Sequence, residues 1–333
     1  MGVELTNTNY CGTRDILIGG PPCQVFSRVG IGKMRKLGRD VSSDHRNFLY
    51  QEFLRFLIYY QPLCFVMENV DNLANKNKQD VISKIVEGFS NSAGEQRGYR
   101  VDFRVLDASK FGVPQKRMRL FIVGVRSDLC LDPPFPEVRT TVPPVSVGEA
   151  ISDLPNLQPF VMPLKIKSSG PKQDDIELHY KSSPQSSYQK KMRRWQGDSE
   201  GVFNHLCRAH NEKDIEIFSM MHQGSKYKDL PKEVMRYRAD IFDDKYKRLF
   251  WHEPSWTLTA HMQKDCLAYI HPLQNRSISV REAARIQSFP DNFRFYAPMT
   301  RMFELVGNSV PPLLAQAVAK PLVKIVRNYY KNL

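Results

Sequence analysis

The chain has 333 residues, of which 41% are hydrophobic and 25% are charged, as in an ordinary globular protein with one large domain or two unequal ones. No apolar run is long enough to span a bilayer, and the first residues are too polar for a secretion signal. The formal net charge of +13 favours a polyanionic partner, most commonly nucleic acid, although a protein that is basic only for solubility has the same excess.

The first third of the chain alternates short apolar runs with helical patterns. This alternation predicts an α/β fold with a largely parallel sheet, whose ligands bind beyond the carboxyl ends of the strands. In chain order we expect a strand at 15–18, a helix at 46–60 ended by Pro62, a strand at 64–67, a helix at 81–89, an edge strand at 101–106 and a strand at 120–125.

The pattern changes after residue 130, where a proline-rich stretch leads into Ser- and Lys-rich sequence with weak periodicity. We expect irregular structure there. After residue 250 regular signals return: Ser279–Glu282 has the spacing of a capping box that opens a helix closed by Pro290, and Pro311-Pro312 begins a last helix. The sequence therefore divides into the segments 1–130, 131–250 and 251–333.

The six cysteines are scattered, without the paired spacing of a zinc site and without a secretion signal that would favour disulfides. We expect reduced thiols in a cytoplasmic protein and no bound metal. Cys23 differs from the others because it follows a predicted strand on a turn stiffened by Pro21 and Pro22. Such a turn holds a thiol outward, as a nucleophile requires, although an incidental cysteine in a turn is the alternative.

A glycine-containing loop with four positive charges follows at residues 27–36. A mobile basic loop suits clamping over a phosphate backbone, and a solvated loop is an equally good interpretation. Glu68 follows an apolar strand, where α/β enzymes often place an acid or base, although a lone glutamate there is more often structural. Arg117 and Arg119 share one face of the next predicted strand and could bind an anion or a carbonyl oxygen, or simply lie on the surface.

Five motifs occur in the order Pro21-Pro22-Cys23-Gln24, Glu68-Asn69-Val70, Gln115-x-Arg117-x-Arg119, Arg281–Pro290 and Gly307–Pro312. Together they closely resemble the motifs of the cytosine-5 DNA methyltransferases. The resemblance covers roughly residues 15 to 320, with a variable middle where that family has its target recognition domain. Further similarity lies at 256–260, 264–265 and 270–272.

The resemblance implies a Rossmann-like sheet of the S-adenosylmethionine-dependent methyltransferase type. Residues 1–130 would be the partial catalytic domain, 131–250 a smaller target recognition domain, and 251–333 the segment that returns to the catalytic domain. The enzyme would flip a cytosine out of double-stranded DNA. By matching position, Cys23 would add to C6, Glu68 would hold the N3 and N4 edge, and Arg117 with Arg119 beside it would bind O2.

The same resemblance implies the other contacts of the site. The methyl donor S-adenosylmethionine would lie near Pro21, Asn308, Ser309 and Val310, and the Arg281–Pro290 motif would be structural. The residues expected to contact DNA are Gln24, Ser27, Arg28, Lys33 and Arg35. The middle region would read the sequence through basic residues beside aromatics, namely Lys190, Lys191, Arg193, Arg194 and Trp195, then Lys226 and Lys228, then Lys245, Lys247 and Arg248.

The sequence departs from the family at the donor-binding end. A Phe-x-Gly-x-Gly strand and loop, with acidic residues for the donor's ribose and adenine, is absent from residues 1–14 and from the residues after Pro312. We therefore expect an exposed strand edge, and either a companion polypeptide that supplies the missing motifs or an interrupted gene. The alternatives are a catalytically inactive DNA-binding remnant and a tRNA cytosine-5 methyltransferase.

Overall fold

The computed structural model describes residues 15–21, 49–74, 79–92, 98–138, 143–158, 178–195, 201–235 and 246–333. The chain forms two compact units. The first comprises residues 1–106, 118–137 and 317–333, and the second comprises 107–117 and 138–316. The division into 1–130, 131–250 and 251–333 stays a prediction, because compactness alone does not test where a recognition function begins.

A four-stranded sheet forms the centre of the first unit. Its strands are β1 (Ile16–Gly19), β2 (Cys64–Val70), β3 (Tyr99–Asp107) and β4 (Met118–Arg126), in the order β1-β2-β4-β3. All four strands were predicted, and β3 lies at one end of this order, as expected of an edge strand. At the other end is β1, whose Ile18 side chain is 71% exposed.

The direction of β4 differs from the prediction of a largely parallel sheet. β1 and β2 are parallel, with Gly19 opposite Met67, but β2 and β4 are antiparallel. Between β3 and β4 the chain contains only the short 3-10 helix η5 (Ala108–Phe111). A parallel connection needs a crossover of a dozen or more residues, usually a helix, which this segment does not provide.

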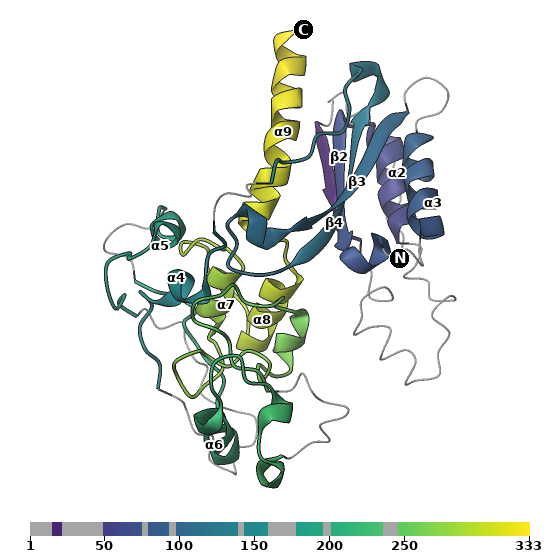
Figure 1. Cartoon of the computed structure of the whole chain (residues 1–333). Coiled ribbons are helices and arrows are strands. Elements are labelled where there is room, and N and C mark those ends of the chain that lie inside the picture. The colour runs from purple at the N-terminus through teal and green to yellow at the C-terminus, as the bar shows by residue number, and fades with distance from the viewer. Residues whose placement is uncertain are drawn as a thin grey trace. The chain divides into compact units, whose positions relative to one another are not determined.

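Helices α2 (Tyr50–Tyr60) and α3 (Gln79–Ser90) cover one face of the sheet (Figure 1). Alternate residues of β2 and β4 point to this face, because successive strand side chains point to opposite sides. Both helices were predicted, and α2 ends as expected just before Pro62, with Gln61 in the left-handed conformation (φ 42°). The core that they bury comprises Phe53, Leu57, Phe65, Met67, Leu73, Ile82, Ile85, Phe89, Tyr99, Leu120 and Ile122.

The last helix, α9 (Pro312–Lys331), begins at the predicted proline pair. In the first unit its Tyr330 hydroxyl donates to Asp15 Oδ1 at 2.7 Å, which ties the end of the helix to the residue before β1. Two short 3-10 helices, η2 (Asp71–Ala74) and η6 (Ser127–Leu129), follow β2 and β4. Within the described ranges, no helix is long and apolar enough to cross a membrane.

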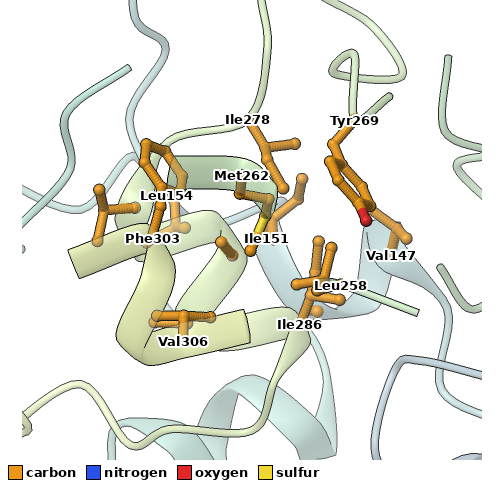
Figure 2. Packing of buried hydrophobic residues seen from close by; sticks show 14 of the residues in the cluster. Val147, Ile151, Leu154, Leu258, Met262, Tyr269, Ile278, Ile286, Phe303 and Val306 are labelled. Carbon is orange, nitrogen blue, oxygen red and sulfur yellow. The ribbon is translucent and has the colours of Figure 1, made fainter. Parts of the chain in front are cut away.

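Short helices and irregular segments build the second unit, as predicted for its middle part. Figure 2 shows the close packing of its larger core, to which Ile151, Leu258 and Phe303 contribute fully or almost fully buried side chains. A smaller core gathers around Phe218 and Tyr246. The helices are α4 (Val147–Ile151), α5 (Ser187–Met192), α6 (Glu212–Met220), η7 (Tyr227–Asp229), η8 (Lys232–Val234), η9 (Ala260–Gln263), α7 (Val280–Ile286) and α8 (Met299–Asn308).

The Arg281–Pro290 motif contributes to the larger core of the second unit. Ser279 and Glu282 form the predicted capping box of α7. Arg285 is fully buried and donates from Nε to Asp291 Oδ1 at 2.5 Å and from Nη1 to Asp153 Oδ1 at 3.2 Å. Buried charges are tolerated when they are paired and hydrogen-bonded in this way, and the arrangement agrees with the structural role expected for this motif.

Candidate active site

The turn that leads to Cys23 lies beside Glu68. Because β1 and β2 are parallel and Gly19 pairs with Met67, the residues after Gly19 run alongside Glu68. A Cβ atom on Gly20 would lie 3.3 Å from Glu68 Oε2, so glycine allows the turn to approach the carboxylate closely. Asn69 Nδ2 donates to the Pro21 carbonyl oxygen at 3.4 Å. Cys23 itself lies outside the described residues.

Glu68 forms an ion pair with Arg119. The distance from Arg119 Nε to Glu68 Oε1 is 2.9 Å. Glu68 is opposite Phe121 and Val70 is opposite Arg119, so the two charged side chains are diagonal neighbours on one face of an antiparallel pair. Their side chains are 21% and 14% exposed, respectively. This geometry offers a carboxylate and a guanidinium side by side at the end of β2.

Burial affects the charge of this pair. Desolvation lowers the pKa of the Arg119 guanidinium, while the nearby Glu68 and Asp71 carboxylates act in the opposite direction. An arginine stays protonated at neutral pH despite such a shift. The pair can therefore present one hydrogen-bonding carboxylate and one fixed cation to the same planar molecule.

Arg117 has a different environment from Arg119. Arg117 immediately precedes β4, whereas Arg119 lies within it. Its side chain is 1% exposed and donates to three main-chain carbonyl oxygens, those of Leu258, Gly307 and Ser309, at 2.6, 2.9 and 3.1 Å. These bonds give Arg117 a place in the interior of the second unit. Its predicted contact with the cytosine stays a prediction.

Three of the residues predicted to contact the methyl donor lie at the end of α8 or just after it. Asn308 is exposed, whereas Ser309 and Val310 are partly buried. Gln287 Nε2 donates to the Ser309 carbonyl oxygen at 2.7 Å and to its hydroxyl at 3.1 Å. The polar atoms of Ser309 are thus bonded within the protein, while the Asn308 amide is available to a ligand.

These residues fit only part of S-adenosylmethionine. The exposed Asn308 amide can bond to a polar group, but Ser309 and Val310 beside it supply neither an acidic partner for a ribose nor an amide-lined loop for the rest of the donor. The match of the described residues to the donor is therefore partial.

The structure leaves the predicted DNA-contacting loop untested. Gln24, Ser27, Arg28, Lys33 and Arg35 all lie outside the described residues.

The basic residues that the structure describes in the middle region differ in exposure. Lys190, Lys191 and Arg194 are exposed at α5, and the Arg194 guanidinium lies 4.9 Å from the ring of Trp195, which is 66% exposed. Arg193 and Arg248 instead face inward. They were grouped with the DNA-contacting residues because sequence alone does not distinguish an exposed cation from one that binds carbonyl groups.

Sequence reasoning missed the role of two buried glutamines, Gln115 and Gln287. Gln115 Nε2 donates to Gln287 Oε1 at 2.5 Å, and both side chains are fully buried. The sequence feature that could have identified them is that each glutamine belongs to one of the five motifs, although no chemical role is assigned to it.

The family model described as C-5 cytosine-specific DNA methylase matches residues 4–324. Type II methyltransferase M.DdeI from Desulfomicrobium norvegicum is 36% identical, over 92% of this chain and 72% of that protein. Type II methyltransferase M.Bpa9945I from Bacillus paralicheniformis is 34% identical, over 95% of this chain and 72% of that protein.

A solved structure gives the same result for the fold. It is described as a DNA modification methyltransferase encoded within a prophage (E. coli), and it superimposes with a TM-score of 0.69 at 26% identity, covering 95% of this chain and 80% of that one. The mixed α/β fold is therefore that of the S-adenosylmethionine-dependent DNA methyltransferases. The chain belongs to the C-5 cytosine-specific DNA methylase family.

Proposed function

We propose that this chain transfers a methyl group from S-adenosylmethionine to C5 of a flipped-out cytosine in a specific sequence of double-stranded DNA. The observation that carries the proposal is the Glu68–Arg119 pair beside the turn that leads to Cys23. Cys23 follows Pro21 by two residues in the sequence, and the proposal assigns its thiol to this site.

The proposed chemistry uses three side chains. The Cys23 thiolate adds to C6 of the cytosine and forms a C–S bond, while Glu68 holds the N3 and N4 edge and supplies a proton to N3. Charge that develops at O2 is stabilised by a guanidinium. C5 would then take the methyl group from the sulfonium of S-adenosylmethionine, with S-adenosylhomocysteine as the leaving group. Water would take the C5 proton as the thiolate departs, and N3 would return its proton to Glu68, which restores the aromatic ring.

The geometry favours Arg119 over Arg117 as the cation at O2. Arg119 contacts the carboxylate that would hold the base, so both groups can bind one edge of the same ring. Arg117 is already committed to three carbonyl oxygens. In this proposal Arg119 binds the base and Arg117 supports the site indirectly.

Two further surfaces complete the proposal. Pro21, Asn308, Ser309 and Val310 contact the donor, and a polypeptide segment with the Phe-x-Gly-x-Gly motif binds most of it. Among the described strands β1 ends the strand order, and a strand at that position can pair with a further strand, which supports this arrangement. Gln24, Ser27, Arg28, Lys33 and Arg35 contact the DNA backbone, and residues 131–250 read the sequence. In this proposal DNA methylation takes place in the cytoplasm.

The test is covalent trapping on duplex DNA that contains 5-fluorocytosine. The chain is expressed alone and together with the N-terminal segment of M.DdeI, and each preparation is incubated with the DNA and S-adenosylmethionine. Loss of the C5 substituent cannot occur with fluorine, so a Cys23 adduct should accumulate in the co-expressed preparation and be absent from Cys23→Ser.

Each other outcome corrects a specific part of the proposal. Trapping by the chain alone would show that no companion segment is needed. Methylation of tRNA in place of duplex DNA would identify the RNA substrate. DNA binding without any adduct or methyl transfer in either preparation would identify a binding remnant and refute the proposed catalysis.

A further inference from the structure

A buried polar network joins three of the sequence motifs in the second unit. Its side chains are Gln115, Arg117 and Gln287, which are 0%, 1% and 0% exposed. Gln115 Nε2 donates to Gln287 Oε1 at 2.5 Å, and Arg117 Nη1 lies 3.5 Å from Gln115 Oε1. Buried networks of this kind hold one geometry, because breaking any bond leaves a polar group without its partner.

The network ends on the main chain at the C-terminal end of α8. Arg117 Nη2 donates to the carbonyl oxygens of Gly307 and Ser309, at 2.9 and 3.1 Å. Gln287 Nε2 donates to the same Ser309 oxygen at 2.7 Å. The residues before and after Asn308 are thus held by side chains from two distant motifs.

A second segment restrains the same stretch from another side. Gln115 Oε1 accepts a hydrogen bond from the Leu258 amide at 2.9 Å, and Arg117 Nη1 donates to the Leu258 carbonyl oxygen. Immediately after Leu258, the main chain of Thr259 and Ala260 packs directly on Gly307, where a Cβ atom would lie only 2.3 Å from either residue. The end of α8 therefore has little freedom to move.

Asn308 differs in exposure from its neighbours in this restrained stretch. Gly307 is buried and Ser309 is partly buried, but the Asn308 side chain is exposed. The backbone on both sides of this exposed amide is thus held in place.

We propose that Gln115, Arg117 and Gln287 are positioning residues that set the conformation of Gly307–Val310 and aim Asn308 at the methyl donor. The aim at the donor rests on the proposed function, whereas the setting of the conformation does not. Arginine suits this task because its planar guanidinium can donate to several carbonyl oxygens at once. Lysine cannot reproduce that geometry.

The test compares Arg117→Lys and Gln287→Met with Arg248→Lys. Arg248 is a matched control, because it is also buried and donates to the carbonyl oxygens of His271, Pro272 and Gln274, far along the chain from Gly307. Gln287→Met conserves the side-chain volume and serves if Arg117→Lys does not fold. Amide hydrogen exchange is followed for peptides that cover residues 305–313, and thermal stability is measured in parallel.

We expect exchange in residues 305–313 to become about tenfold faster or more in Arg117→Lys and Gln287→Met, since a lost bond to a buried carbonyl favours local opening. Arg248→Lys should lower thermal stability without this local effect. Equal exchange in the control and in the two network variants would overturn the proposal.

Donor affinity provides a readout that a general loss of stability does not move. In the preparation that contains the companion segment, Kd for S-adenosylmethionine should rise about tenfold in both network variants, and Kd for duplex DNA should stay unchanged. Faster exchange with unchanged donor Kd would overturn the aim of Asn308 at the donor. Faster exchange when no preparation binds the donor at all would support the network and refute the proposed methyl transfer.

Discussion

Arg119 Nε lies 2.9 Å from Glu68 Oε1, and this ion pair connects two motifs that are 51 positions apart in the sequence, from 68 to 119. If Arg119 stabilises charge at O2 of the cytosine, Arg119→Met should lower the single-turnover rate of methyl transfer by about 10²- to 10³-fold. The double variant Glu68→Gln/Arg119→Met should cost little more than the worse single variant, because groups that act as a unit are not additive. The measurement is transfer of labelled methyl groups into duplex DNA by the active preparation.

Arg104→Met is the control for this prediction. Arg104 is exposed on β3 and forms an exposed ion pair with Asp102. Its replacement should leave the rate unchanged. An equal loss of rate in both variants would show that the effect of Arg119 comes from surface charge.

Local patterns predicted most of the first unit. The four strands, α2, α3 and the start of α9 follow from apolar periodicity and from prolines, because these signals act over a few residues. The antiparallel β4 was not predicted, since the direction of a strand depends on the connection before it and not on its own residues.

The candidate site was predicted in part, for a similar reason. The motif order identified Glu68 and Arg119, which the structure brings together. It did not distinguish Arg117 from Arg119, because two arginines two positions apart look alike until the strand is known to begin at Met118. Which cations are buried depends on distant carbonyl groups, as Arg248 shows, and no local pattern encodes that.

Gly307→Ala should destabilise the protein. A Cβ atom there would lie 2.3 Å from the main chain of Thr259 and Ala260, so α8 must shift, at a cost of about 1–3 kcal/mol. Gly88→Ala on α3 is the matched control, because its Cβ atom would make an ordinary contact 3.7 Å from Leu54. That replacement should stabilise by about 0.5–1 kcal/mol through helix propensity. Urea unfolding measures both, and the same sign for the two variants would contradict the packing argument.

Arg285→Met should be far more damaging than loss of a surface ion pair. It would leave the buried carboxylates of Asp153 and Asp291 without their main cation, which costs about 3–5 kcal/mol. Arg301→Met removes only an exposed pair with Glu304 and should cost less than about 1 kcal/mol. Thermal unfolding compares them. Similar losses would mean that the interior around Arg285 rearranges or admits water.

The buried His271 should make stability depend on pH. Burial lowers its pKa to about 4, and its Nδ1 accepts hydrogen bonds from the amides of Leu273 and Gln274, which requires the neutral ring. In the unfolded chain His271 binds a proton near its ordinary pKa of about 6.5. The contribution of the neutral ring to stability is therefore fully present above that pH and is lost as the pH falls toward 4.

His271→Asn tests this dependence, because the Asn side-chain oxygen can accept from the same two amides without titrating. The free energy of unfolding should fall less steeply between pH 6.5 and pH 4 in this variant than in the natural protein. The exposed His261 provides the control, and His261→Asn should follow the natural profile. Parallel profiles for all three proteins would show that other groups cause the acid sensitivity.

Lys190 and Lys191, exposed at α5, should contribute to DNA binding through phosphate contacts. Each phosphate contact adds about 0.9 to the slope of log K against log salt concentration, so the double variant Lys190→Ala/Lys191→Ala should lower that slope by about 1.8. It should weaken binding of specific and unrelated duplexes alike, because phosphate contacts carry no sequence information.

Lys84 is an exposed lysine on α3, and Lys84→Ala controls for the loss of charge alone. The slope is measured by fluorescence anisotropy across a salt series. If it stays unchanged in the double variant, α5 does not touch the DNA backbone, and the contacts of the middle region must come from its other exposed cations, such as Arg194 beside Trp195.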